Sequence, residues 1–399
     1  MAILSVTVNP TRKIMKPSKP HFIGAVAAAL LFIVLVFSHG SLPGGRFEGY
    51  RGTTEGVANN TLMHVMNETL GFQQIFVMAL PERSDRRDAM SLQASFTGIK
   101  FKWIQGVKGE TVPEKAVPPA WPIAADKKGV LGSWRGHMNI IQKVAKDNIQ
   151  SALIMEDDAD WDVMLKSQLL EFARGTRYLQ HAQQDSVSPY GDDWDILWLG
   201  ICKSKNDDGK DQQYYIINKD PTVVPAELRT ATGRLPSLPP QVLTDKYTRV
   251  IYEPYGGGCT YGYAVSLRGA RALLYSQGLT TEGTTMDKAL KRLCKKSTFN
   301  TRCFAPYPAL IGTHKPAGDS SRDSDREESA GAIREKAVTQ NIVYSTRLNL
   351  ENMVRQKAIE SQYPEDTLFP SYNDSIEIPQ GYGTMVSKEQ FAMQDKLVS

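Results

Sequence analysis

The most constraining feature of this chain is a short apolar run that ends in clustered acids. Residues 152–155 are followed directly by Glu156, Asp157 and Asp158, and Asp160 comes two residues later. Such a run predicts a buried strand with acids at its carboxyl end, the edge where open α/β sheets bind ligands. Clustered carboxylates repel one another unless a cation lies between them, and oxygen ligands suit Mg²⁺ or Mn²⁺. A strand that runs into an acidic, solvated loop is the alternative interpretation.

The amino-terminal region predicts a membrane anchor. Residues 22–37 are apolar or small without interruption, and the chain before them holds Arg12, Lys13, Lys16 and Lys19 but no acid. We therefore expect a cytoplasmic tail at 1–20, a single transmembrane helix at 21–38 and a stem at 39–71. This type II topology would place the rest of the chain in the lumen of the Golgi or endoplasmic reticulum. A cleaved signal peptide is the alternative.

Features after the predicted anchor agree with a lumenal body. Asn-x-Ser/Thr triplets, the acceptors of N-linked glycans, begin at Asn59, Asn67 and Asn373, and all 4 cysteines also follow the anchor. In an oxidising compartment four cysteines could form two disulfides, for which three pairings exist. The nearness in sequence of Cys294 and Cys303 favours that pair.

Strand and helix patterns alternate through a folded body that we expect to begin near Phe72. This alternation predicts a parallel or mixed sheet flanked by helices. We expect one helix to be capped by Ser133 and another to start near Arg268. The strands are predicted at residues 74–80, 101–104, 152–155, 196–199 and 261–265. Farther along the chain, we expect an insertion loop at 221–248, helix at 330–357, and a tail at 363–399 that packs on the body or frays.

Three features of the sequence are candidates for ligand binding: a group of arginines, a histidine and a glycine run. Arg83, Arg86 and Arg87 could bind a phosphate or a base, or could form a solvated face. His137, at the head of an apolar stripe, could hydrogen-bond a substrate or orient an acid, although a buried structural histidine is at least as common. The glycine run at 256–258 could let the backbone approach a sugar, but an ordinary turn is the more common use of such a run.

Two residues in the second half of the chain are candidates for chemistry. Asp287 could deprotonate an acceptor hydroxyl, with Glu282 as its rival, or could simply cap a helix. His314 could complete the coordination of a metal or could lie in a surface loop.

Segments spread over residues 72–325 resemble glycosyltransferase family 25, in the same order. IFVMALPERSDRRDAM resembles the opening strand and L-x-x-R-x-D-R loop of that family. LGSWRGHMNIIQKVAKDNIQSALIMEDDADWD resembles its G-C-x-x-S-H helix and I-x-E-D-D strand. Further resemblance lies in IKFKWIQGVKGE, DDWDILWLG, YGYAVSLRGARALL and MDKAL. Ser133, Gly136 and Lys108 depart from the family pattern, and residues 326–399 form an extension outside it.

The resemblance implies an α/β fold of GT-A type, with a Rossmann-like mixed sheet flanked by helices. It also implies a metal-dependent, inverting transfer of galactose or another hexose from a UDP-sugar to an acceptor hydroxyl, with Mn²⁺ or Mg²⁺ as cofactor. Asp157 and Asp158 match the motif that binds metal and donor, and Asp287 matches the base. We add Asp160 and His314 as candidate metal ligands.

The donor side of the site follows from the same resemblance. Arg83, Asp85 and Arg86 match the loop on the uridine side, and Glu156 is expected to bind the donor beside Asp157. His137 matches the histidine of the family helix and is our second candidate for catalysis.

Other classes of function have less support in the sequence. A net charge of +4 over 399 residues, without a long basic run, does not predict a nucleic-acid surface. A glycoside hydrolase needs two carboxylates across a cleft, whereas adjacent acids at one strand end suit a metal better. A non-catalytic lumenal protein that binds a glycan or a partner enzyme on the same fold is the main alternative. The expected partners are a nucleotide sugar and a glycan or protein acceptor.

Overall fold

The computed structural model describes residues 61–119, 121, 127–204, 207, 210–229, 238, 242–281, 283–295, 299–326 and 331–391. All of them belong to one unit of the chain, Thr53–Ser399. Within these ranges, no helix combines the length and the apolar character that crossing a membrane requires. The predicted cytoplasmic tail, the transmembrane segment at 21–38, the stem up to residue 60 and Asn59 lie outside the described residues.

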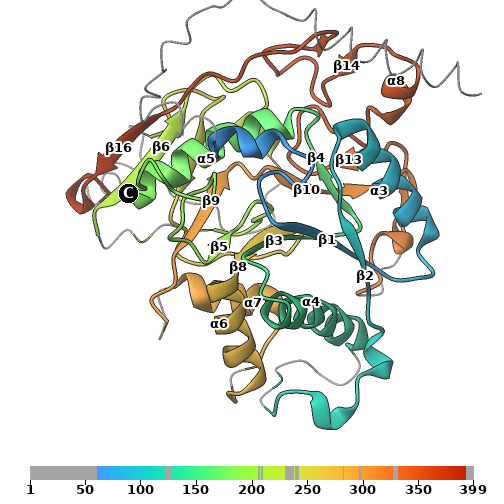
Figure 1. Ribbon diagram of the computed structural model, residues 1–399. Helices are drawn as coiled ribbons and strands as arrows, with labels where there is room; N and C mark the ends of the chain where they lie inside the picture. The colour runs from blue at the N-terminus through green and yellow to red at the C-terminus, as the bar shows by residue number, and fades with distance from the viewer. Residues whose placement is uncertain are drawn as a thin grey trace, which may run out of the picture. The chain divides into compact units, whose positions relative to one another are not determined.

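A nine-stranded mixed sheet forms the centre of the described chain, in the order β16-β6-β7-β9-β5-β8-β3-β1-β2 (Figure 1). β1 pairs in parallel with β2 and β3, and β5 pairs in parallel with β9. The other neighbours in this sheet are antiparallel. Its strands are β1 Gln74–Ala79, β2 Lys102–Gln105, β3 Ser151–Glu156, β5 Ile196–Leu197, β6 Gln212–Ile217, β7 Arg249–Tyr252, β8 Gly262–Ser266, β9 Cys303–Tyr307 and β16 Tyr382–Val386.

The predicted mixed sheet is confirmed, and so are its predicted strands. β1, β2, β3, β5 and β8 match the segments expected from the sequence, with ends that differ by one or two residues. The apolar pattern reports burial, whereas the ends of a strand depend on hydrogen bonds to its neighbours, so small shifts are expected. The smaller strands lie outside this sheet: β4 Ala159–Trp161, β10 Ile311–Lys315, β11 Gly318–Asp319, β12 Ile333–Arg334, β13 Val338–Thr339, β14 Ile359–Glu360 and β15 Ser371–Tyr372.

Helices cover both faces of the central sheet. α3 (Ser84–Thr97) and α5 (Leu165–Gln180) lie on one face, and α4 (Lys128–Lys146), α6 (Leu267–Gly278) and α7 (Met286–Cys294) lie on the other (Figure 1). Successive side chains of β3 point to opposite faces, so Leu153 packs in the core with α3 and α5, and Ile154 packs in the core with α4, α6 and α7. Burial on both faces explains why this strand is an unbroken apolar run.

The long helix α4 carries the apolar stripe that its sequence predicts. It begins at Lys128, so the prediction that Ser133 caps this helix is wrong, and Ser133 lies inside the helix. The side chains of the predicted stripe are all buried: His137, Ile140, Ile141 and Val144. A stripe at this spacing turns one side of the helix towards the sheet, and it leaves the first turns of α4 beside the carboxyl ends of the parallel strands.

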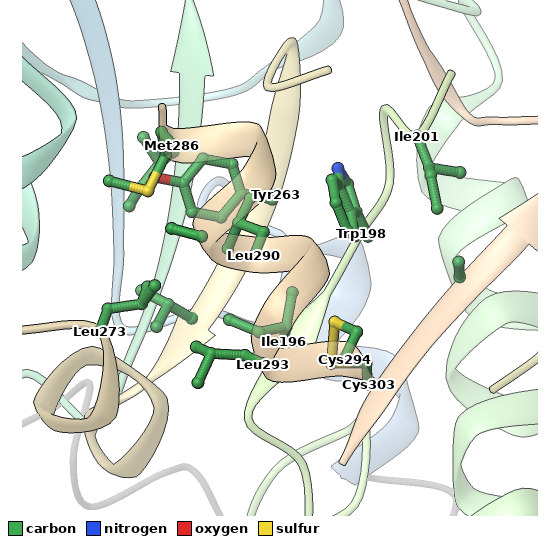
Figure 2. Packing of buried hydrophobic residues seen from close by; sticks show 14 of the residues in the cluster. Ile196, Trp198, Ile201, Tyr263, Leu273, Met286, Leu290, Leu293, Cys294 and Cys303 are labelled. Atoms are coloured by element: carbon green, nitrogen blue, oxygen red, sulfur yellow. A yellow bond between two sulfur atoms is a disulfide. The ribbon is translucent and has the colours of Figure 1, made fainter. Parts of the chain in front are cut away.

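The helices α6 and α7 complete this face of the core. α6 begins at Leu267, next to the predicted start at Arg268. α7 turns Met286, Leu290 and Leu293 into the core, at positions one or two helical turns apart (Figure 2). Figure 2 shows these side chains beside Ile196 of β5 and Tyr263 of β8. The packing of this apolar face therefore fixes the position of the first turn of α7, which carries Asp287.

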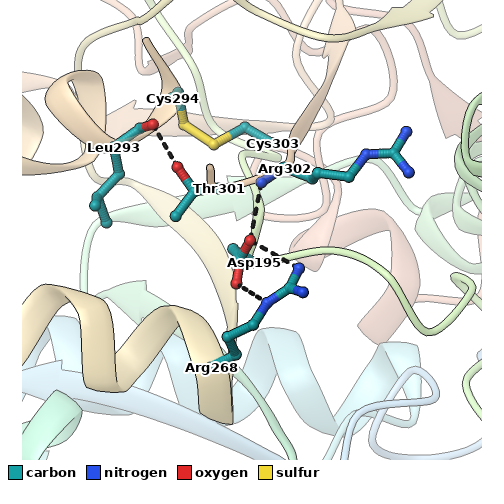
Figure 3. Close-up of a disulfide and its surroundings, with 7 residues drawn as sticks. All are labelled: Asp195, Arg268, Leu293, Cys294, Thr301, Arg302 and Cys303. Carbon is teal, nitrogen blue, oxygen red and sulfur yellow. Dashed lines mark hydrogen bonds and ion pairs between the residues drawn. A yellow bond between two sulfur atoms is a disulfide. The ribbon is translucent and has the colours of Figure 1, made fainter. Parts of the chain in front are cut away.

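A disulfide fastens the end of α7 to the sheet, and it is the pair that the sequence favours. Cys294 of α7 is bonded to Cys303 of β9 (Figure 3). Beside it, the buried carboxylate of Asp195 accepts hydrogen bonds from the side chain of Arg268 and from the backbone amide of Arg302. These links join α7, α6 and the strands β5 and β9 into one framework.

The carboxyl-terminal segment corrects one prediction. Residues 330–357 are not one helix: β12 and β13 lie in this segment, and its helix, α8, spans only Leu350–Val354. The backbone here bonds to a distant part of the chain, because Val163 N donates to Tyr344 O at 2.9 Å and Tyr344 N donates to an oxygen of Asp162 at 3.0 Å. These long-range hydrogen bonds replace the local ones that a helix would need.

The structure also extends the folded body at both ends. Val65 and Leu70 are fully buried, so residues that shortly precede the predicted start near Phe72 also pack on the folded body. At the other end, β16 pairs antiparallel with β6 as an edge strand of the central sheet. The tail therefore packs on the body as far as residue 391. The predicted insertion at 221–248 connects β6 with β7 and includes the short 3₁₀ helix Ala226–Leu228.

Candidate active site

The carboxyl ends of β1, β2 and β3 open onto a cavity of about 460 Å³, which we call the β3 cavity. It lies at the sheet edge where the sequence predicts a ligand site. The side chains of three predicted acids line it together with one of the predicted arginines and two residues that depart from the family pattern: Glu156, Asp157, Asp158, Arg86, Lys108 and Ser133.

Asp157 is neutralised by a neighbouring arginine. Arg86 Nη1 donates to Asp157 Oδ1 at 2.6 Å, and both side chains are largely buried. Burial raises the pKa of Asp157, although the charge and hydrogen bond of Arg86 oppose this shift. Arg86 also donates to the backbone oxygen of Asp323, so the guanidinium is held between β3 and a distant loop. A guanidinium fixed in a cavity wall is suited to bind phosphate as well as carboxylate.

Asp158 is the acid that lacks compensation. Its Oδ1 atom is buried and has no hydrogen-bond partner among the described residues. Burial raises the pKa of Asp158 to about 7, and the nearby charges of Glu156 and Asp157 add to the shift while Arg86 opposes it. Buried polar atoms in folded proteins are nearly always paired, so an unpaired carboxylate oxygen on a residue that lines a cavity marks a place for a cation or a hydrogen-bond donor.

Glu156 is held by a buried hydrogen-bond chain. His137 Nε2 lies 3.1 Å from Glu156 Oε1, and His137 Nδ1 lies 3.1 Å from the hydroxyl of Tyr263. The hydroxyl of Thr260 donates to the same Glu156 oxygen. Burial would raise the pKa of Glu156, but the hydrogen bonds and charge of this group of residues hold it below the usual value. His137 is fully buried behind Glu156, so it orients the acid and does not face the cavity.

The predicted uridine-side loop forms ion pairs at the rim. Arg83 makes a two-point contact with Asp85, with distances of 3.0 Å and 2.9 Å, and also pairs with Asp325. The hydrogen bond from Arg83 is the main reason that the pKa of Asp85 falls to about 2. Of the predicted residues Arg83, Asp85 and Arg86, the structure places Arg86 in the cavity wall and the other two beside it.

Asp160 and His314 belong to a separate buried network. Asp160 accepts hydrogen bonds from Gln93 Nε2 at 2.8 Å and from the hydroxyls of Thr339 and Ser345. His314 Nδ1 lies 3.0 Å from the hydroxyl of Thr339 and 4.0 Å from Asp160 Oδ2. Because these contacts occupy the Asp160 oxygens, Asp160 is not available to a ligand in the β3 cavity.

The structure therefore does not assemble the four predicted metal ligands around one point. In the ranges that it describes, no three or more His, Cys, Asp or Glu side chains are placed together so as to hold a metal ion. Asp157 and Asp158 line the cavity, whereas Asp160 and His314 do not. Burial lowers the pKa of His314 to about 4, which Asp160 opposes. The backbone of His314 still borders the site, because its amide donates to Asp158 O at 2.8 Å.

Asp287 lines a second cavity of about 660 Å³, which we call the α7 cavity. Asp287 lies in the first turn of α7, where the hydroxyl of Thr285 donates to its Oδ1 at 2.5 Å. Ser324 and Arg326 line both cavities, so the two spaces meet at this pair of residues. Asp287 and the acids Asp157 and Asp158 therefore line neighbouring cavities. Its rival Glu282 lies outside the described residues.

The family model of glycosyltransferase family 25 (LPS biosynthesis protein) matches residues 72–287, more than half of the chain. The chain belongs to glycosyltransferase family 25. The matched range contains both β3 and Asp287, and it ends where α7 begins. The chain after this range supplies Ser324 and Arg326, which line both cavities.

The curated relatives of this family 25 chain include proteins named as galactosyltransferases and one protein named as inactive. Procollagen galactosyltransferase 1 of Danio rerio is 25% identical over 300 residues, which are 70% of this chain and 42% of the relative. Procollagen galactosyltransferase 1-B of Xenopus laevis is 23% identical, over 67% of this chain and 40% of that protein. Inactive glycosyltransferase 25 family member 3 of Homo sapiens is 24% identical, over 70% of this chain and 44% of that protein. The chain spans about two fifths of the length of these relatives, so its activity has to be argued from its own site.

The departures from the family 25 pattern have local structural explanations. A Cβ added at Gly136 would lie 2.3 Å from Met78 Sδ, so the glycine lets α4 pack closely on β1. Lys108 pairs with Glu82 at the rim of the β3 cavity. Ser133 presents a small polar side chain to the cavity. The departures lie at other positions, and the acids at the end of β3 are retained.

Sequence reasoning missed the residues that close the site from the carboxyl-terminal side. Ser324, Asp325 and Arg326 line the β3 cavity, and Arg347 Nη2 donates to the backbone oxygen of Asp157 at 2.7 Å. The run of alternating acids and arginines after Asp319 was the available signal, because charges of both signs in one segment often pair with charges elsewhere.

Proposed function

We propose that this chain is a glycosyltransferase of GT-A type that transfers a hexose, with galactose as the first candidate, from a UDP-sugar to an acceptor hydroxyl. The donor lies in the β3 cavity and the acceptor lies in the α7 cavity. The reaction inverts the anomeric carbon and depends on a divalent metal. The single observation that carries this proposal is the unpaired buried oxygen of Asp158, a residue of the β3 cavity, which shares two lining residues with the cavity of Asp287.

The residues at the end of β3 fit a divalent cation. The unpaired Asp158 oxygen and the neighbouring Asp157 are hard oxygen ligands of the kind that Mn²⁺ and Mg²⁺ prefer. Asp157 and Asp158 would hold the ion, which would bind the diphosphate and offset the charge that forms on UDP. Arg86 supplies a fixed positive charge in the same wall.

The other residues of the two cavities divide the remaining work. Asp287 takes the proton of the acceptor hydroxyl while the hydroxyl oxygen forms a bond to the anomeric carbon. The bond from that carbon to the diphosphate oxygen breaks, and UDP leaves with the electron pair. An acceptor in the α7 cavity attacks from the side opposite UDP, which inverts the configuration. Glu156, oriented by His137, accepts hydrogen bonds from hydroxyls of the donor sugar.

A lumenal location is part of this proposal. In the described residues no cysteine is free: Cys202 is bonded to Cys259 and Cys294 to Cys303. Paired cysteines are typical of oxidising compartments. With the basic and then apolar amino-terminal sequence, this pairing supports a single-pass type II protein of the Golgi or endoplasmic reticulum membrane.

A release assay tests the proposed activity. Purified full-length protein is incubated with a panel of UDP-hexoses, with Mn²⁺, Mg²⁺ or EDTA, and free UDP is measured. We expect release from one UDP-hexose above all others, with metal and not with EDTA. Release with none of them would contradict the proposal.

One observation favours the alternative of a non-catalytic binding protein: one relative is named as an inactive glycosyltransferase. That alternative predicts no UDP release. Its strongest form, a protein that has lost the nucleotide site, also predicts that UDP with Mn²⁺ does not raise the melting temperature. A protein that binds UDP and releases none would have kept the donor site and lost the chemistry.

A further inference from the structure

We propose that the acceptor carries an anionic group, a carboxylate or a phosphate, and that Lys203 and Lys315 bind this group in the α7 cavity. This inference rests on the proposed function, because it names the substrate class of the acceptor site.

Uncompensated positive charge lines the α7 cavity. Lys203, Lys315 and Arg326 are exposed on its wall, and within the described residues none of their side chains forms an ion pair. Asp287 is the acid of this wall that is left for chemistry. A cavity with this excess of positive charge attracts anions and disfavours cationic ligands.

The other charged pair of the same wall is neutral as a whole. Arg334 donates through Nη1 and Nη2 to the two carboxylate oxygens of Asp323, at 3.1 Å and 2.6 Å. This two-point contact occupies both side chains, so neither adds to the net charge. The excess of positive charge therefore comes from the two lysines and Arg326.

Lys203 is held in place by its surroundings. The disulfide between Cys202 and Cys259 joins its loop to the turn before β8, and Cys202 N donates to Gly258 O at 3.1 Å. A Cβ built at Gly258 would lie 3.3 Å from both Cβ and Cδ of Lys203, so the aliphatic stem of the lysine lies across this glycine. The glycine run, which sequence reasoning weighed as a close approach to a sugar, thus makes room for a cation at the cavity wall.

Lys315 is held at the end of a strand that is bonded to the end of β3. It is the last residue of β10, where it pairs with Val338 of β13. The preceding residue, His314, bonds through its backbone to Asp158. The position of Lys315 is therefore tied to the acidic end of β3.

The donor diphosphate does not account for these two lysines. Arg326 lines both cavities and so can face the diphosphate, whereas Lys203 and Lys315 line only the α7 cavity. The anion that they bind consequently enters with the acceptor, whose hydroxyl meets Asp287. The anionic group and the reacting hydroxyl would then belong to one molecule.

Binding of matched neutral and anionic sugars tests this inference. Full-length protein is saturated with UDP and the diamagnetic ion Mg²⁺, so that the β3 cavity is filled, and ligand binding is measured by saturation-transfer NMR. The probes are methyl glucoside, methyl glucuronide and methyl glucoside 6-phosphate, and the two anionic probes distinguish carboxylate from phosphate. The variants are wild type, Lys203→Ala/Lys315→Ala, and the control Lys143→Ala/Lys146→Ala, which changes the far end of α4.

We expect at least one anionic probe to bind about fivefold or more tightly than the neutral one, since an exposed charge contact contributes up to about 1 kcal/mol. The Lys203/Lys315 variant should lose this preference while it keeps its melting temperature, and the control variant should retain it. Equal binding of all three probes, binding of none, or a preference that survives in the Lys203/Lys315 variant would overturn the inference. The UDP release assay reports separately on the proposed function, because it requires no acceptor of known charge.

Discussion

Arg86 and Asp157 form a buried ion pair at the carboxyl end of β3, with Arg86 Nη1 2.6 Å from Asp157 Oδ1. The two side chains are only 13% and 9% exposed. Asp158, the next residue, has a buried oxygen without a partner in the described chain. The two adjacent acids at this strand end therefore differ: Asp157 Oδ1 is paired with an arginine, whereas Asp158 Oδ1 is unpaired.

Asp287 is expected to act on the acceptor and not on the donor. Asp287→Asn keeps an oxygen that can accept the hydrogen bond from Thr285, so the first turn of α7 should be preserved. Loss of the base should lower the rate of transfer to an acceptor by about 100-fold or more. The affinity for UDP with Mn²⁺, measured by calorimetry, should not change. Wild-type transfer by Asp287→Asn would show that another group takes the proton.

The buried carboxyl of Asp162 should make stability depend on pH. Burial raises the pKa of Asp162 to about 7, although the backbone amides of Met164 and Tyr344 donate to it. In the unfolded chain an aspartate titrates near about 3.9. The folded state holds the proton between these values, so this contribution to stability is full below about pH 4 and is lost as the pH rises through about 7.

Denaturant unfolding between pH 4 and pH 8, in EDTA, tests this dependence. Asp162→Asn should show a flatter fall in the free energy of unfolding than wild type, whatever its absolute stability. Asp192→Asn, at a position that binds the backbone amides of Val187 and Ser188, is the control and should follow the wild-type slope. An unchanged slope in Asp162→Asn would contradict the account.

His137 is expected to act by positioning Glu156. His137→Ala removes both hydrogen bonds of the ring and leaves a cavity, so it should cost about 3 kcal/mol and weaken UDP-sugar binding. Tyr263→Phe removes one of these hydrogen bonds and leaves Glu156 bonded to His137, so it should cost about 1 kcal/mol. Chemical denaturation and donor titration measure both effects. Equal loss of donor affinity in the two variants would argue against a specific role for the His137–Glu156 contact.

The two disulfides should stabilise the chain unequally. Cys202–Cys259 closes a loop with a sequence separation of 57, and Cys294–Cys303 closes one with a separation of 9. The loop-entropy model gives about 4 kcal/mol for the longer loop and about 3 kcal/mol for the shorter one. Paired Cys→Ser variants, compared by denaturant unfolding, should rank in this order. The reverse order would show that the short disulfide does more than close a loop.

Local patterns predicted the central part of the site, and long-range pairing decided the rest. The apolar residues of β3 and the stripe of α4 are signals within one element, so the sequence placed Glu156, Asp157 and Asp158 at the correct edge. Asp160 follows only two residues after Asp158, but it lies on β4, which exists because it pairs with β10. A contact between residues that are so far apart in sequence leaves no local pattern.

The same cause explains the error at 330–357. Helical composition was the local signal there, and it was overridden by the hydrogen bond from Tyr344 N to Asp162 and the one from Val163 N to Tyr344 O. Ser324 and Arg326 were missed because no pattern within their charged segment shows where it meets the rest of the chain, and the structure places both residues in the walls of both cavities. These two residues reach the site only because the chain folds back to the end of the sheet.

Calorimetric titration of UDP into the purified protein tests the central claim most directly, because that claim concerns the unpaired acid Asp158. The titration is made with Mn²⁺ and with EDTA, for wild type, for Asp158→Asn, and for Asp192→Asn as the control. We predict binding to wild type and to the control with Mn²⁺, and at least tenfold weaker binding both in EDTA and in Asp158→Asn, a loss of about 1.4 kcal/mol or more. UDP binding that is equally tight without metal or without the Asp158 carboxylate, or no binding at all, would contradict the account.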